Sequence, residues 1–343
     1  MTPFLAAAKI EDLKNYCRTH GFPAFRATQI DSWLHTHSVT DPEGMKNLPA
    51  PLKAALKQDF HAPGSQIAEI SSSPDKVEKL LLKLHDGEHI EMVVIPSAER
   101  LTFCLSTQVG CPVGCYFCAS GRNGLTRNLT AGEMLEEFCI GTTHAGRPDN
   151  LVFMGIGEGL LNFEELAKTL NSLVDDFTFS PRRITVSTSG FVPGMKKFAS
   201  LKREFNLAVS LHAPDDTTRA KLIPPKLRYP VNEILNAADE IARANNRQYT
   251  LEYTLIEGIN DSIEHAEKLG KIAFARHAKI NLIPYNETGG SFRRPKSQVI
   301  DDFENAVKST GARVTRRIER GSAETAACGQ LRAKNSPVTA AGE

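Results

Sequence analysis

The chain has 343 residues, of which 41% are hydrophobic and 24% are charged, and its formal net charge is +1. This composition is typical of a globular protein with one large domain and a smaller one, and it gives no global indication of nucleic-acid binding. The N-terminal segment does not have the pattern of a signal peptide, and no apolar run approaches the ~20 residues that cross a bilayer. We therefore expect a cytoplasmic protein with no membrane association.

Residues 1–65 predict a small helical accessory domain. Apolar residues recur there at helical spacing in three segments that Gly and Pro separate, 10–20, 26–37 and 51–60. Two strand-like runs follow within residues 66–96 and are split by the turn-forming HDGEH. This region is therefore expected to be a β-hairpin connector.

Strand-like and helix-like segments alternate from residue 97 to residue 333. The expected strands are 101–107, 151–154, 184–188, 206–210, 249–255, 279–283 and 313–318, and the expected helices are 130–144, 162–176, 191–202, 231–245, 262–276 and 298–310. The alternation predicts an α/β core with a parallel sheet, and the number of units indicates a partial (βα)6 barrel rather than a complete eightfold one. Residues 334–343 are predicted to be a disordered tail.

Three of the seven cysteines, Cys111, Cys115 and Cys118, lie close together after the first core strand. An odd, clustered set of cysteines fits a reducing compartment and a metal or catalytic role. Three thiolates at this spacing can each bind one iron of a four-iron cluster and leave the fourth iron open. The alternative is a structural zinc site that a distant cysteine or histidine completes.

Short polar motifs follow four further strands of the predicted core. They are GIGE at 155–158, STSG at 187–190, SLH at 210–212 and IPYN at 283–286. Because the carboxyl ends of parallel strands lie on one face of a barrel, these motifs and the cysteines are expected to converge there. The sequence therefore predicts an enzyme.

The spacing C-x3-C-x-Phe-C, together with GIGE, resembles the radical S-adenosylmethionine superfamily. The runs FCLSTQVGCPVGCYFCASG, FMGIGEGLLN, VSLHAPDD, KINLIPYN and AACGQL, in this order, closely resemble the adenosine methyltransferases of the RlmN/Cfr family over residues 20–333. The resemblance implies a radical S-adenosylmethionine barrel, a [4Fe-4S] cluster on the three clustered cysteines, and S-adenosyl-L-methionine cleaved to a 5′-deoxyadenosyl radical.

The resemblance also implies three catalytic residues. Cys328 would accept a methyl group from one S-adenosylmethionine, and the radical from a second molecule would activate that methyl group for addition to adenine. Cys104 would then form a disulfide with Cys328 and release the methylated base. Glu91 would remove the ring proton as a general base, although the residues alone indicate only an exposed strand carboxylate.

Further residues are implied as ligands. The contacts to S-adenosylmethionine would come from Gly157, Glu158, Ser187, Ser210, Leu211, His212 and Asn286. The contacts to RNA phosphates would come from Arg122, Arg127, Arg182 and Arg183, because a guanidinium matches phosphate oxygens. Residues 181–230 hold ten Lys or Arg against three Asp or Glu. That excess indicates either a phosphate-binding patch or an ordinary solvated surface.

The expected function is methylation of an adenosine carbon, C2, in 23S rRNA, with tRNA as a second candidate substrate. The resemblance implies an electron donor such as flavodoxin or ferredoxin, and we expect a monomer. Three alternatives stay open: an adenosine C8 methyltransferase, a radical enzyme acting on a different RNA or a small molecule, and an RNA-binding module that a metal stabilises.

Overall fold

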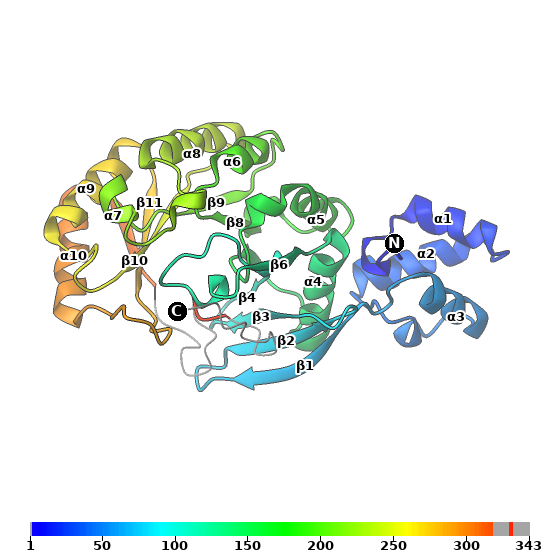
Figure 1. Cartoon of the computed structure of the whole chain (residues 1–343). Coiled ribbons are helices and arrows are strands. Elements are labelled where there is room, and N and C mark those ends of the chain that lie inside the picture. Colours follow the sequence, from blue (N-terminus) through cyan, green and yellow to red (C-terminus); the bar gives the residue numbers. More distant parts are fainter. Residues whose placement is uncertain (1, 318–328, 332–343) are drawn as a thin grey trace.

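The structure is a computed structural model that describes residues 2–317 and 329–331. A small helical unit stands to one side of a larger α/β body (Figure 1). Its helices are α1 (Ile10–Thr19), α2 (Phe25–Asp31), which continues as a π-helical turn, and α3 (Ala50–Asp59). Their apolar faces form a core of their own, separate from that of the body. The unit contacts the body through α4 (Ala131–Ala145), where Thr143 Oγ1 donates to the carbonyl oxygen of Ser38 over 3.1 Å.

A ten-stranded sheet organises the described part of the body, in the order β1-β2-β3-β4-β7-β8-β9-β10-β11-β12. The strands are β1 (Ser65–Ser72), β2 (Glu78–Leu84), β3 (His89–Pro96), β4 (Leu101–Cys104), β7 (Asn150–Phe153), β8 (Ile184–Thr188), β9 (Asn206–Ser210), β10 (Thr250–Leu255), β11 (Lys279–Pro284) and β12 (Arg313–Arg316). Neighbouring strands run parallel from β4 to β12 and antiparallel from β1 to β4.

Helices cover the outer side of the curved sheet (Figure 1). They are α4, α5 (Phe163–Asp175), α6 (Val192–Ala199), α8 (Val231–Asn245), α9 (Ile263–Ala275) and α10 (Ser297–Ser309), with the short α7 (Asp216–Arg219) before α8. In β8, Ile184 and Val186 point into the main apolar core, whereas Thr185 and Ser187 alternate with them and face the other side. The inner side of β8 therefore carries polar side chains.

The predicted partial barrel is confirmed, and each expected core helix and strand forms within a few residues of its predicted bounds. The region 66–96 is more than a connecting hairpin, because β3 pairs with β4 and extends the barrel sheet. Strand β1 was not expected. Its residues are mostly exposed, and a bulge between Ile67 and Glu69 interrupts the alternation that marks a strand.

Two other expectations concern residues that the structure does not describe. The tail predicted at 334–343 lies outside the described residues, as does Cys328. Among the described helices, none combines the length and the apolar character that a bilayer crossing requires.

Candidate active site

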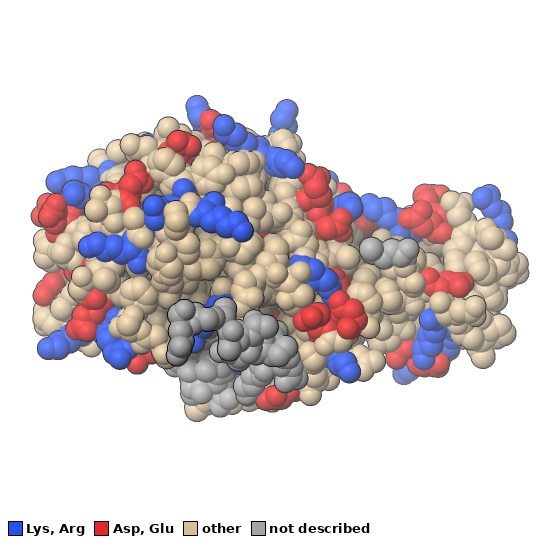
Figure 2. All heavy atoms as spheres, in the orientation of Figure 1, with Lys and Arg blue, Asp and Glu red and all other residues tan. Residues whose placement is uncertain are grey.

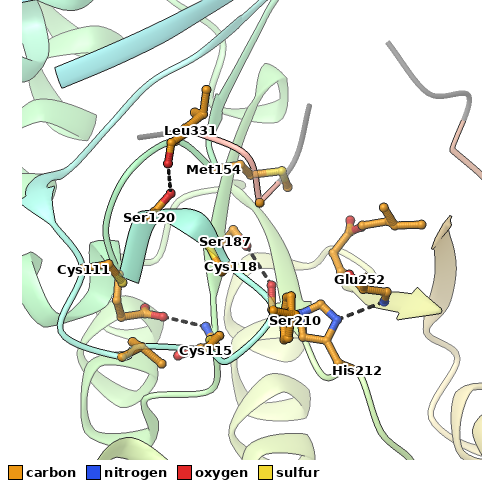
Figure 3. Close-up of a pocket in the computed structure, with 18 of the residues that line it drawn as sticks. Cys111, Cys115, Cys118, Ser120, Met154, Ser187, Ser210, His212, Glu252 and Leu331 are labelled. Atoms are coloured by element: carbon orange, nitrogen blue, oxygen red, sulfur yellow. Dashed lines mark hydrogen bonds between the residues drawn. The ribbon is translucent and has the colours of Figure 1, made fainter. Parts of the chain in front are cut away.

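The loops at the carboxyl ends of the parallel strands enclose a cavity of about 160 Å³ (Figure 3). A single water needs ~10–15 Å³, so this space is suited to a larger ligand. Its walls include nine of the predicted site residues, Cys111, Cys115, Cys118, Gly157, Glu158, Ser187, Ser210, His212 and Asn286. Leu211 is buried but does not line the cavity, and neither do Glu91 and Cys104.

A short two-stranded ribbon closes the cysteine loop at its base. It pairs β5 (Gln108–Gly110) with β6 (Leu125–Asn128) and was not predicted from the sequence. Gly110 has a φ of 76°, and a Cβ at this position would lie 2.1 Å from the carbonyl oxygen of Gly124. Only glycine allows this close approach of the two chain segments. At the far end of the loop, the amide of Tyr116 donates to the carbonyl oxygen of Leu222 over 3.0 Å.

The three clustered thiols lie on one side of the cavity (Figure 3). They are partly buried against an apolar group that includes Val113, Phe117 and Leu222. Burial raises the pKa of the Cys111 thiol to about 12, and burial with two neighbouring thiolates raises the pKa of Cys115 well above its ordinary value. Thiolates in this setting need a cationic partner, which iron supplies.

These thiols suit a cluster better than a single ion. Among residues 2–317 and 329–331, no group of three His, Cys, Asp or Glu side chains is arranged to hold one metal ion. Structural zinc needs such convergence of ligands on one ion, whereas an iron–sulfur cluster takes each thiolate on a different iron. The donor set therefore fits a [4Fe-4S] cluster on Cys111, Cys115 and Cys118.

The glycine-rich turn after β7 brings backbone to the cavity wall. Gly157 has a φ of 115°, and a Cβ there would lie 2.6 Å from Thr107 Oγ1. The next residue, Glu158, is buried, and its carboxylate accepts a hydrogen bond from the amide of Ser189 over 2.6 Å. Burial raises the pKa of Glu158, and the backbone donors oppose that rise. The Glu158 carboxylate thus joins the loops that follow β7 and β8.

His212 lies opposite the cysteine loop, at the end of β9. Its Nδ1 accepts a hydrogen bond from the amide of Thr254 over 3.0 Å, and its ring packs edge-on against Phe117 at a centroid distance of 4.9 Å. Burial lowers the pKa of His212 from 6.5 to about 3, so the ring is neutral at physiological pH. Since Nδ1 accepts, the single ring proton is on Nε2.

Cys104 and Glu91 lie on the antiparallel part of the sheet, on strands β4 and β3. Cys104 is buried in an apolar group with Val93, Ile156 and Leu331. Leu331 also lines the cavity, and its carbonyl oxygen accepts from Ser120 Oγ over 2.7 Å (Figure 3). The exposed carboxylate expected at Glu91 is wrong, because this side chain is buried. No disulfide joins two cysteines of the described residues, and the expected partner of Cys104, Cys328, lies outside them.

Comparisons with known proteins agree with this geometry. Residues 105–269 match the radical SAM superfamily, and residues 5–61 match the N-terminal domain of ribosomal RNA large subunit methyltransferases. A probable dual-specificity RNA methyltransferase RlmN from Akkermansia muciniphila is 42% identical, with 96% of this chain and 95% of the relative covered. The RlmN relative from Rhodopirellula baltica is 40% identical over 96% of this chain and 91% of its own length.

A solved structure shares the whole fold. The radical SAM methyltransferase from Sphaerobacter thermophilus superposes with a TM-score of 0.92 at 38% identity, covering 97% of this chain and all of that one. The chain belongs to the RlmN family of radical SAM methyltransferases. This assignment makes the protein an enzyme and agrees with the resemblance that its motifs predicted.

Arg219 is a residue of this RlmN-family site that sequence reasoning missed. Its side chain is fully buried, and its guanidinium donates to the carbonyl oxygens of Leu211 (3.2 Å) and Ser189. Burial lowers the pKa of Arg219 to about 10, so it stays cationic at neutral pH. The arginine therefore ties together the loops after β8 and β9. Its positive charge partly opposes the rise that burial causes in the pKa of Cys115. Arg219 ends the polar run DDTTR, and such a run is typical of a protein surface, so nothing in the sequence indicated that this arginine is buried.

Glu252 was also missed. It lies on β10, lines the cavity, and accepts a hydrogen bond from Asn281 Nδ2 over 2.7 Å. Burial raises the pKa of Glu252, and the charge of Arg317 opposes this rise. The polar alternation Thr250, Glu252, Thr254 in a parallel strand was a usable signal, because such strands are usually apolar throughout.

The arginines predicted to bind RNA phosphates are mostly engaged within the chain. Arg127 is paired with Glu133 at 2.8 Å and Asp86 at 2.7 Å, which locks β6 to α4. Arg182 and Arg183 precede β8, at the end of the sheet opposite to the cavity, and pair with acidic side chains there. Arg122 stays near the cysteine loop, where it donates to Thr288 Oγ1 over 2.9 Å.

Several basic residues of the stretch 181–230 are paired with acidic side chains of the same chain. Ion pairs join Lys197 to Glu164 and Arg203 to Asp175, each at 2.8 Å. Figure 2 shows Lys and Arg interspersed with Asp and Glu on the face drawn there. These observations favour the solvated-surface alternative for this stretch.

The pKa of His212 gives a prediction for the cluster-free chain. Unfolded protein binds a proton at this imidazole below about pH 6.5, whereas the folded protein stays neutral down to about pH 3. The free energy of unfolding should therefore fall by about 1.4 kcal/mol per pH unit on acidification within this window, from this one group.

Replacing His212 should remove that contribution. His212→Asn keeps a residue that tolerates the φ of 59° at this position. Urea unfolding of both proteins between pH 4 and 6 measures the difference, and parallel pH dependences would contradict the neutral buried imidazole.

Arg219→Met should destabilise the fold strongly. It leaves buried carbonyl oxygens without donors, and we expect a loss of about 3 kcal/mol or more in the free energy of unfolding. Arg182→Met, at an exposed ion pair, is the control and should change stability little. Denaturant unfolding measures both, and equal stability of Arg219→Met and wild type would refute the assigned role.

Proposed function

We propose that this enzyme methylates an adenosine carbon of RNA, C2 in 23S rRNA, with tRNA as a second substrate. The main support is convergence: the three cysteines and the strand-end motifs that the family resemblance singled out line one cavity. The relatives' description as dual-specificity RNA methyltransferases supports an RNA substrate. The match of residues 5–61 to a ribosomal RNA methyltransferase domain points the same way.

The family resemblance suggests the roles of the cavity residues, and their position around one cavity supports them. Cys111, Cys115 and Cys118 would hold a [4Fe-4S] cluster, and Gly157, Glu158, Ser187, Ser210, His212 and Asn286 would surround S-adenosylmethionine. Leu211 does not line the cavity. It would support the site through its backbone, because its carbonyl oxygen accepts a hydrogen bond from the Arg219 side chain. When bound, two molecules of S-adenosylmethionine supply a methyl group and the radical that activates it.

The chain's own nucleophile would be Cys328. Gly329, which is bonded covalently to Cys328, lines the cavity, and its carbonyl oxygen accepts from the amide of Ala119 on the cysteine loop over 2.7 Å. Leu331 packs with Cys104, the thiol that we propose forms a disulfide with Cys328 and releases the product. Glu91 lies on the same sheet face as Cys104, and it would remove the proton of the adenine ring.

Three accompanying inferences concern the cellular setting. We infer that the enzyme works in the cytoplasm, where RNA and a reducing environment are available. A small one-electron protein such as flavodoxin or ferredoxin would reduce the cluster. The enzyme would act as a monomer, because one chain supplies all of the groups assigned to the site.

Cluster loading gives the first test. Anaerobically reconstituted protein should be brown and bind about four irons per chain. Cys111→Ala, Cys115→Ala and Cys118→Ala should each lose the colour and most of the iron. Cys139→Ala, at a buried thiol in α4, is the matched control and should keep both. Stoichiometric zinc in place of iron would contradict the proposed chemistry.

Nucleoside mass spectrometry of rRNA and tRNA from a deletion strain tests the reaction. We expect loss of 2-methyladenosine, and its return with the wild-type gene or Cys17→Ala but not with Cys328→Ala. Cys104→Ala should instead accumulate a covalent RNA–protein adduct. Loss of 8-methyladenosine would move the assignment to C8, and unchanged nucleosides would reject both reactions.

A further inference from the structure

A buried ion pair lies on the antiparallel part of the sheet. Lys79 Nζ on β2 is 3.1 Å from Glu91 Oε1 on β3, and the two side chains are only 5% and 1% exposed. A lysine is rarely buried unless it is paired, because removing its charge from water is costly. The pairing therefore indicates a specific electrostatic role for Lys79, which no feature of the sequence suggested.

The strand register puts this pair on the same face as Cys104. Val93 on β3 is opposite Lys79 of β2 on one side and opposite Cys104 of β4 on the other. Glu91 is two residues from Val93, so its side chain is on the same face and diagonal to both of these neighbours. Diagonal positions on one sheet face are about 7–8 Å apart, within reach of long side chains.

The opposite face of β3 has a different use. Ile90, Met92 and Val94 point into the main apolar core and exclude water there. On the face of Glu91, Val93 and Cys104 instead pack with Leu331, which lines the cavity. The ion pair is thus on the sheet face that carries Cys104 and not on the face that packs into the main core.

Other titratable groups on this face surround the pair. Glu69 of β1 borders the same small space as Lys79 and Glu91, with Ser71 and Leu81 completing its walls. On the same sheet face, Cys104 of β4 is diagonal to Glu91. Lys83 of β2 and His89 of β3 are opposite each other on this face, next to the turn that joins β2 to β3. Within this group, Lys79 forms an ion pair with the Glu91 carboxylate.

We propose that Lys79 is a positioning residue that keeps the Glu91 carboxylate ionised and oriented as the base, an inference that rests on the proposed function. In the proton-removal step, the C–H bond of the methylated ring carbon breaks and the proton moves to a Glu91 oxygen. The electron pair of that bond stays in the purine ring, and the unpaired electron that radical addition left there would return to the iron–sulfur cluster. Lys79 does not take part in this transfer.

The ionisation argument follows from burial. A carboxylate out of water is driven toward its neutral form, and a neutral carboxyl cannot accept the ring proton. A cation beside the carboxylate favours the charged form instead, and Lys79 supplies that cation at 3.1 Å. Without Lys79, the acid form of Glu91 should persist to higher pH.

Resolution of the RNA–protein adduct tests the proposal. In Lys79→Met the adduct should form as in wild type but should resolve about tenfold more slowly near pH 6, with the rate recovering as the pH is raised to about 9. Lys79→Arg keeps the charge and should restore most of the wild-type profile. Lys83→Met, at an exposed lysine on the same strand and face, is the matched control and should match wild type.

Two results would overturn the role of Lys79. One is an adduct-resolution rate of Lys79→Met that equals that of wild type at every pH. The other is a resolution rate that is lower than that of wild type by the same factor at every pH, which a lysine with only a structural role would give. If Lys79→Met does not fold, Lys79→Gln keeps a hydrogen-bond donor and carries the same test. Wild-type protein that never methylates RNA or forms the adduct would instead overturn the proposed function.

A second measurement needs no cofactor or RNA. The infrared difference between Lys79→Met and Lys79→Met/Glu91→Gln at neutral pH should contain the carbonyl stretch of a protonated carboxyl. The difference between wild type and Glu91→Gln should contain carboxylate bands instead. Carboxylate bands in both differences would overturn the claim that Lys79 keeps Glu91 ionised, whatever the enzyme methylates.

Discussion

Parallel pairing from β4 to β12 brings the carboxyl ends of these strands to one edge of the sheet, and the loops that leave this edge build the site. Each strand delivers its polar end group to the same space, as Ser187, Ser210 and Asn286 demonstrate. The inner face of the sheet also carries polar side chains such as Glu252. The partial barrel thus keeps a cavity at this edge, whereas the interior of a complete barrel is filled with packed side chains.

Buried polar groups hold the loops in position around this cavity. The Glu158 carboxylate and the Arg219 guanidinium both bond to the backbone of Ser189, one to its amide and the other to its carbonyl oxygen. Arg219 continues to Leu211 in the next loop. These contacts link three consecutive loops through the chain's own groups, and such preorganisation spares the enzyme the cost of ordering them during the reaction.

The antiparallel strands β1 to β3 extend the sheet beyond the barrel. Their pairing to β4 continues the face of Cys104 with Glu91 and Lys79. The residues proposed as the general base and the resolving thiol therefore share one rigid sheet rather than mobile loops. A charged pair survives there because its two members are buried together, and each offsets the desolvation of the other.

Much of the barrel was predictable because its signals are local. Helical and strand periodicities located β8, β9 and α8 at their observed bounds, and the order of motifs along the chain was enough to bring Cys111 and Gly157 to one edge. Family resemblance, rather than periodicity, supplied the roles of these residues.

The interactions between distant segments were decided only by the tertiary structure. The sequence alone determined the alternating α/β core and the cysteine loop, since these follow from neighbouring residues. It could not reveal that Arg219 is buried, that Arg127 is held by Glu133 and Asp86, or that Lys79 meets Glu91. A charged residue in the sequence looks the same whether solvent or a buried partner surrounds it, and only the packing of the strands and loops determines which.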